Sequence, residues 1–173
     1  MSLIVLGTAC VWCIVLCWFD LTQRRLPNWL TVGGILAALV VRFGFLGWPS
    51  LVDGFAAAAI SGGLLFIPFL MHAAGGGDVK MLAAGGAVVG WASVLPFLFL
   101  TSVFGVIVAL ASLVFGKVNP ARLKHFTRCL VDWRYDRKSG AVALPPRSDE
   151  SARVPFSIPI AAALLAVMLG QVS

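Results

Sequence analysis

Apolar runs separated by short polar connections follow one another along the whole chain. An α-helix that crosses the hydrocarbon core of a bilayer needs about 17 to 25 predominantly apolar residues. We interpret six runs as membrane-spanning helices, with the break between the fourth and the fifth the least clearly marked: residues 3–19, 28–46, 51–71, 79–90, 96–115 and 154–170. The predicted fold class is therefore all-α, a polytopic membrane protein of about six transmembrane helices that forms one domain over residues 1–173.

Composition agrees with this interpretation. Hydrophobic residues make up 60% of the chain and charged residues only 12%, a balance that suits lipid better than the core of a soluble domain of this size. The net charge of +6 could indicate a nucleic-acid partner, but the cations gather in the connections between apolar runs. We therefore expect membrane lipid, and not nucleic acid, as the partner of the basic side chains.

Lysine and arginine set the expected orientation. All 13 of them except Arg42 lie in three alternate connections, residues 21–27, 72–80 and 116–153. The positive-inside rule places those connections in the cytoplasm and both termini on the non-cytoplasmic side. The basic loop, about 116–153, is expected to contact anionic lipid headgroups, with binding of a partner protein as the alternative. Arg42, near the far end of the second run, is expected to snorkel to the interface.

Most of the seven acidic residues have an ordinary explanation. Four lie in the basic loop, where a solvated surface of mixed charge accounts for them. Asp53, at the start of the third run, is expected to cap a helix. Asp20 and Asp78 remain, and both fall at the membrane edge assigned to the cytoplasm. Because a carboxylate costs roughly 3 kcal/mol in the bilayer centre, these two need a specific reason.

Two carboxylates at one membrane edge can act as an acid–base pair. The ionised one takes a proton from water, which attacks a peptide carbonyl, while the protonated one polarises that carbonyl and later protonates the leaving amine. The structural alternative is that Asp20 ends the first helix at the interface and that Asp78 caps the fourth. Lys80 then either tunes Asp78 or anchors its helix at the headgroups. The residues alone leave both alternatives open.

Other kinds of chemistry lack a motif in this sequence. His72 and His125 are not accompanied by a Ser or Cys in a nucleophile motif, and no cluster of residues has the spacing of zinc ligands. Cys10, Cys13 and Cys17 share one face of the first helix, which suits small buried side chains better than a metal site. We expect neither a metal nor an organic cofactor.

Two spaced motifs carry a resemblance to a known family. Asp20, five residues and then Leu26-Pro27-Asn28 form the first, and Gly75-Gly76-Gly77-Asp78-Val79-Lys80 forms the second. Together they resemble the type IV prepilin leader peptidases, which are aspartic proteases of the Gly-x-Gly-Asp class. The family usually has Ile-Pro-Asn where this chain has Leu-Pro-Asn. The opening of the last run, Arg153-Val154-Pro155-Phe156, is also similar to the family's last helix.

The resemblance implies a function and a site. Members of the family cut the short basic leader from prepilins at the cytoplasmic face of the bacterial inner membrane, which makes Asp20 and Asp78 the expected catalytic residues. The residues expected in support are Gly75, Gly77, Lys80, Pro27 and Asn28. This short chain is similar to the leader peptidases of the Flp-pilus, tight-adherence subtype. N-methylation of the new amino terminus is not expected, because members with that activity carry paired Cys-x-x-Cys motifs and Cys10-x-x-Cys13 has no second pair.

Helix dipoles suggest how the two carboxylates divide the work. If the first helix ends at Asp20, its negative end favours a protonated carboxyl there, and if the fourth starts at Asp78, its positive end favours an ionised one. We therefore expect Asp78 as the water-activating base and Asp20 as the acid. The rival interpretation is a small membrane transporter whose two aspartates relay protons or ions, although a relay favours groups near mid-membrane.

Overall fold

The computed structural model describes residues 3–23, 26–70, 75–114 and 156–171. The chain divides into two compact units, Met1–Gly105 with Pro155–Ser173, and Val106–Val154. The regular structure of the described residues is helical throughout, which confirms the all-α prediction. The basic loop, together with Arg24, Arg25, His72 and His125, lies outside the described residues. The assignment of one domain to residues 1–173 stays a prediction.

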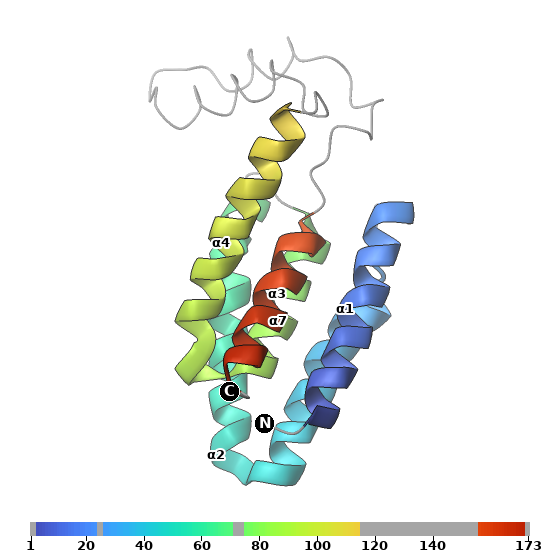
Figure 1. Ribbon diagram of the computed structural model, residues 1–173. Helices are drawn as coiled ribbons and strands as arrows, with labels where there is room; N and C mark the ends of the chain where they lie inside the picture. The colour runs from blue at the N-terminus through green and yellow to red at the C-terminus, as the bar shows by residue number, and fades with distance from the viewer. Residues whose placement is uncertain (1–2, 24–25, 71–74, 115–155, 172–173) are drawn as a thin grey trace. The chain divides into compact units, whose positions relative to one another are not determined.

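The first unit contains four helices and most of a fifth (Figure 1). Their bounds are α1, Leu3–Gln23; α2, Asn28–Leu70; α3, Gly76–Val89; α4, Trp91–Val114; and α7, Ser157–Gly170. The last turns of α4, from Val106, belong to the second unit. In that unit the Ser112 hydroxyl donates to the Val108 carbonyl one turn earlier in the same helix.

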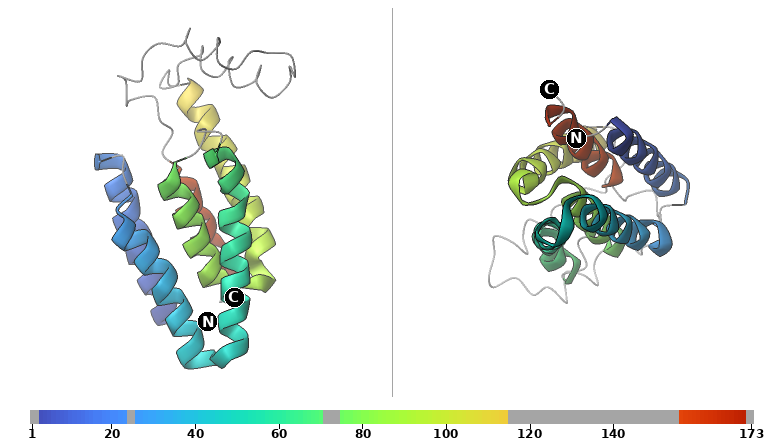
Figure 2. Two further views of the ribbon diagram at one scale, coloured as in Figure 1. Left: turned by 180° about the vertical axis from the view of Figure 1, so that it is seen from behind. Right: turned by 90° about the horizontal axis from the view of Figure 1, so that it is seen from below.

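The helix α2 consists of two arms that meet at Gly47. The backbone of Gly47 has a φ of 76°, in the left-handed region that glycine adopts without a steric penalty. Figure 2 shows the chain turning back on itself between the two arms. The second and third predicted runs therefore correspond to the two arms of α2. The turn between them is confined to a single non-helical residue, because Trp48, Pro49 and the residues that follow already belong to the second arm.

The break between the fourth and fifth runs lies at Gly90, which has a φ of 78° and follows the last residue of α3. The prediction that the next helix starts near Pro96 is wrong, because α4 begins at Trp91 and Pro96 lies inside it. The carboxylate of Asp53 accepts a hydrogen bond from the Trp91 backbone N–H at 3.2 Å. The start of α4 is therefore set by this cap and not by Pro96.

Two helix ends also differ from the prediction. The first helix does not stop at Asp20, because α1 continues to Gln23. Asp78 is not an N-cap, because α3 is capped by Gly75 and Asp78 is its third residue. Both carboxylates therefore lie within the terminal turn of a helix and not at the residue that ends it.

The core of the first unit is formed around the two shortest helices, α3 and α7. The helix α3 packs against α2 and α7, and α7 also packs against α1. Small residues on α3 allow close approach: a Cβ added at Gly85 would lie 2.5 Å from the ring of Phe97, a fully buried residue of α4. Cys13 of α1 is 2% exposed and belongs to the same core. The expectation of a small buried side chain is confirmed for this cysteine.

Three helical stretches are long and apolar enough to cross a bilayer: Val5–Gln23, Asn28–Phe66 and Trp91–Ser112. The helices α3 and α7 have 14 residues each, about 21 Å of rise, which is shorter than the hydrocarbon core of about 30 Å. The chain is thus a helical membrane protein with three candidate spanning helices among its described residues. A count of six spans stays a prediction.

Candidate active site

The two sequence motifs meet in the folded chain. Gly77, from the glycine-rich motif, lies directly against Leu26, because a Cβ added at Gly77 would lie 2.9 Å from the Leu26 Cβ. The ammonium group of Lys80 donates a hydrogen bond of 2.7 Å to the side-chain oxygen of Asn28. Residues separated by about fifty positions therefore form one junction. The Lys80 side chain thus ties α3 to the start of α2, and its two expected roles, toward Asp78 or toward the headgroups, stay predictions.

Asp78 lies in the first turn of α3, where the chain leaves an extended conformation at Gly75. The backbone N–H of Asp78 donates to the Gly75 carbonyl at 3.1 Å, which closes the first helical turn. A Cβ at Gly75 would lie 2.9 Å from the Asp78 Oδ2. The glycine thus leaves room for the carboxylate beside the backbone. The half-buried Asp78 lies at the helix end whose free N–H groups favour negative charge.

Asp20 is held by the first residue of α7. Its Oδ2 accepts a hydrogen bond of 2.5 Å from the Ser157 hydroxyl and one of 3.4 Å from the Ser157 backbone N–H. Asp20 is half-buried and Ser157 is fully buried. The sequence motifs did not include Ser157. A serine at the start of the last apolar run, two residues after Pro155, is a helix-start signal that could have drawn attention to it.

The helix α7 connects the surroundings of the two carboxylates. It packs against α1, which carries Asp20, and against α3, which carries Asp78. Both α3 and α7 begin at the end of the unit at which α1 ends (Figure 1). Within the first unit, the sequence-predicted residues Asp20, Asp78, Asn28 and Lys80 therefore belong to helix ends on one side.

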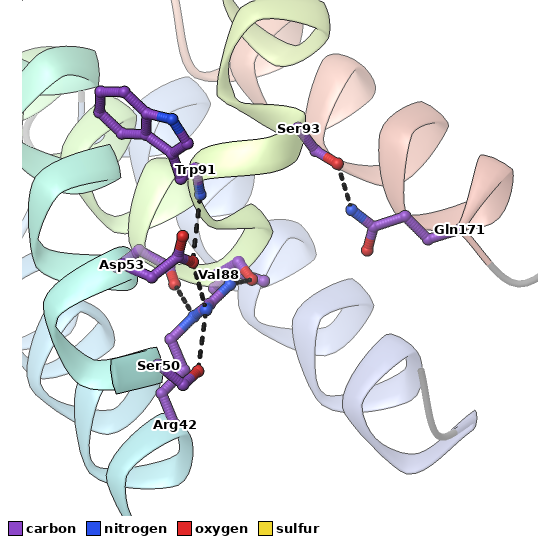
Figure 3. Close-up of polar contacts among 8 residues, drawn as sticks. Arg42, Ser50, Asp53, Val88, Trp91, Ser93 and Gln171 are labelled. Atoms are coloured by element: carbon purple, nitrogen blue, oxygen red, sulfur yellow. Dashed lines mark hydrogen bonds and ion pairs between the residues drawn. The ribbon is translucent and has the colours of Figure 1, made fainter. Parts of the chain in front are cut away.

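The opposite end of the same unit holds an ion pair that the sequence did not predict (Figure 3). Arg42 and Asp53, one from each arm of α2, are 2.9 Å apart. The Arg42 guanidinium also donates to the carbonyl oxygens of Ala87 and Val88, at 2.7 and 3.0 Å. Its side chain is 15% exposed. The expectation that Arg42 snorkels to the interface is wrong, because its charge is used inside the protein.

Arg42 and Asp53 together cap the two helix ends that meet at Gly90. Arg42 bonds carbonyls in the last turn of α3, and Asp53 bonds the first N–H of α4. These are the groups that a helix leaves without partners at its ends, and they are costly to leave unpaired away from water. The prediction that Asp53 caps the run that contains it is wrong: Asp53 lies inside the second arm of α2 and instead caps the start of α4.

The described residues contain no group of three or more His, Cys, Asp or Glu side chains that could hold a metal ion. What the candidate site offers is two half-buried carboxylates in the terminal turns of two helices, Asp20, which a buried serine holds, and Asp78, on the helix that a lysine ties to an asparagine of α2. Carboxylates of this kind can hold and transfer protons and activate water. These features define the class as a helical membrane protein with candidate acid–base carboxylates.

Comparison with known protein families makes the assignment specific. The chain matches the model of the type IV leader peptidase family over residues 8–110, more than half of its 173 residues. It therefore belongs to this family and is a peptidase. The matched region contains Asp20, Asp78 and both motifs, whereas Ser157 lies outside it. No curated protein and no solved structure matches the chain.

Proposed function

We propose that this protein is an aspartic endopeptidase that removes the basic leader from prepilin-like precursors at the cytoplasmic face of a bacterial inner membrane. Asp20 and Asp78 are the catalytic carboxylates of this proposal. The observation that carries it is the junction of the glycine-rich motif with Leu26 and Asn28, within the region that matches the leader peptidase family. The junction links the turn that presents Asp78 to the connection that follows Asp20.

The reaction needs only the two carboxylates and a water molecule. One carboxylate takes a proton as the water oxygen attacks the scissile carbonyl carbon, and a tetrahedral intermediate forms. The other, protonated, carboxyl donates its proton to the amide nitrogen as the carbon–nitrogen bond breaks. The products are the leader, with a new carboxylate, and the pilin, with a new amino terminus. Methylation of that terminus is not part of the proposal.

The helix-dipole argument no longer decides which of the two aspartates is the acid and which is the base. The dipole argument assumed that the first helix ends at Asp20, but α1 continues to Gln23 and Asp20 also contacts the first N–H of α7. Asp20 therefore lies near a negative helix end and a positive one at the same time. The assignment of Asp20 as the acid and Asp78 as the base no longer follows.

In this proposal the orientation of the chain in the membrane is the one that its lysines and arginines predict by the positive-inside rule. The six helical segments of the described residues, with α2 counted as two arms, are six crossings or partial crossings of the bilayer. Both termini lie on the non-cytoplasmic side, so the ends of α1, α3 and α7 that carry the site face the cytoplasm. The basic loop, about 116–153, is assigned to the cytoplasmic side of the membrane, where it contacts anionic lipid headgroups.

Co-expression with a prepilin tests the function. Leader removal is followed by the mass of the pilin amino terminus in cells that contain the wild-type chain, Asp20→Asn or Asp78→Asn. We expect each variant to lose cleavage by at least about 100-fold, because a general acid or base contributes 10²- to 10⁴-fold. The matched control is Asp53→Asn, which removes a carboxylate at the other end of the unit and should cleave in proportion to its folded amount. Normal cleavage by either Asp20→Asn or Asp78→Asn refutes the catalytic pair.

A further inference from the structure

Ser157 makes two contacts with one oxygen of Asp20. The hydroxyl and the backbone N–H of this residue both bond Oδ2, and the other oxygen, Oδ1, takes no part in either hydrogen bond. We propose that Ser157 is a positioning residue that assigns Oδ1 of Asp20 as the oxygen that exchanges a proton during peptide cleavage. The inference rests on the proposed function of Asp20.

The chemistry of the donors supports this assignment. A backbone N–H can donate a hydrogen bond but cannot accept one. The Ser157 hydroxyl can donate or accept, but a protonated Oδ2 would be a poorer acceptor for the N–H than a carbonyl-type oxygen. Two donors directed at Oδ2 therefore favour an unprotonated Oδ2, and the proton that Asp20 gains or loses is favoured on Oδ1. A carboxyl group whose two oxygens are distinguished in this way presents a single reacting atom to water or substrate.

Burial and packing make Ser157 a fixed point for the carboxylate. Its side chain is 0% exposed, and its neighbours Pro159 and Ile160 are buried as well. The N–H is part of the first turn of α7, which packs against α1 and α3. Rotation of the Asp20 carboxylate would break both bonds at once. The reacting oxygen is thus oriented by the core of the unit, and orientation of this kind lowers the barrier of the chemical step.

A comparison of three variants tests the inference with purified protein in detergent and a prepilin as substrate. Ser157→Ala removes the hydroxyl, Ser157→Thr keeps it, and Ser61→Ala is the matched control. Ser61 is also fully buried in a helix of the same unit, and among the described residues its hydroxyl has no hydrogen-bond partner, so its replacement reports the packing cost alone of deleting a buried hydroxyl. We expect Ser157→Ala to lower kcat by about 10- to 100-fold, the range for a lost hydrogen bond to a charged group. KM should stay within about twofold of wild type, and Ser157→Thr should recover most of the rate.

Each outcome decides the question. Unchanged kcat in Ser157→Ala, or a loss that Ser157→Thr does not restore, overturns the positioning role. A loss that matches Ser61→Ala in both kcat and folded amount overturns it too, since a packing role then suffices. If Ser157→Ala does not accumulate, Ser157→Cys carries the same test, because a thiol of similar size is a weak donor and should lower kcat without changing KM. Normal cleavage by Asp20→Asn refutes the proposed function itself, whereas an inactive Asp20→Asn beside a fully active Ser157→Ala refutes only this inference.

Discussion

The ion pair between Arg42 and Asp53 is expected to be one of the strongest polar contributions to the stability of the first unit. The two groups are 2.9 Å apart, with exposed side-chain fractions of 15% and 38%. Exposed pairs contribute about 0 to 1 kcal/mol, and breaking a fully buried pair costs about 3 to 5 kcal/mol. The observed burial lies between these cases. We therefore expect a coupling free energy of about 2 kcal/mol between the two side chains.

A double-mutant cycle measures this coupling. Arg42→Met removes the guanidinium while keeping an apolar stem, and Asp53→Asn removes the charge while keeping an oxygen that can accept from the Trp91 N–H. The free energy of unfolding is obtained from denaturant titrations in mixed micelles, followed by tryptophan fluorescence. Arg42→Met should cost more than Asp53→Asn, because Ala87 and Val88 also lose a donor. The double variant should be more stable than the sum of the single losses predicts by about 2 kcal/mol.

Additive losses would refute this reasoning. Independent sites add to within about 0.5 kcal/mol, so a coupling below that value means that the pair does not act as one unit. The control cycle combines Arg42→Met with Thr22→Ala, because the Thr22 hydroxyl donates to Trp18 in its own helix. That control cycle should be additive.

Two further predictions use glycines with a common control, Gly63→Ala, where an added Cβ meets nothing within 4 Å. Gly90→Ala should lower the free energy of unfolding by about 1 to 3 kcal/mol from the backbone alone, because Gly90 combines a φ of 78° with a ψ of 178°, a region essentially restricted to glycine. The loss should be larger still because the new Cβ would clash with the Arg42 guanidinium, and a thermal melt no lower than that of Gly63→Ala contradicts this. Gly77→Ala should reduce prepilin cleavage, because the Cβ would lie 2.9 Å from the Leu26 Cβ and push apart the junction beside the site. Cleavage by Gly77→Ala at the rate of the control variant would show that close packing at Gly77 is not needed.

The hydrophobic pattern was sufficient to predict the helical elements. Apolar runs of this length have few stable structures other than helices in a bilayer, so the all-α class and the approximate position of each helix follow from local sequence. The glycines at positions 47 and 90 mark both sharp breaks, although the sequence did not show that each break is a single residue. The two spaced motifs also identified the family, which the comparison over residues 8–110 confirms.

The polar contacts between helices could not be predicted in this way. Arg42 was expected at the lipid interface and Ser157 was not considered, yet one caps α3 and the other holds Asp20. Hydrogen bonds of this kind depend on how each helix is rotated about its axis and on which helices are neighbours. When a helix is apolar on most of its faces, the periodicity of its sequence specifies neither its rotation about the axis nor its neighbouring helices.

The sequence by itself therefore determined the helices, the family and the two candidate carboxylates. Only the tertiary structure decided which groups surround those carboxylates. The physical reason is that an unpaired polar group is costly away from water, so the helix ends at Gly90 and the Asp20 carboxylate take the partners that packing provides. For Asp20 that partner is 137 positions away in the chain, and only the packing of α7 against α1 brings the two together.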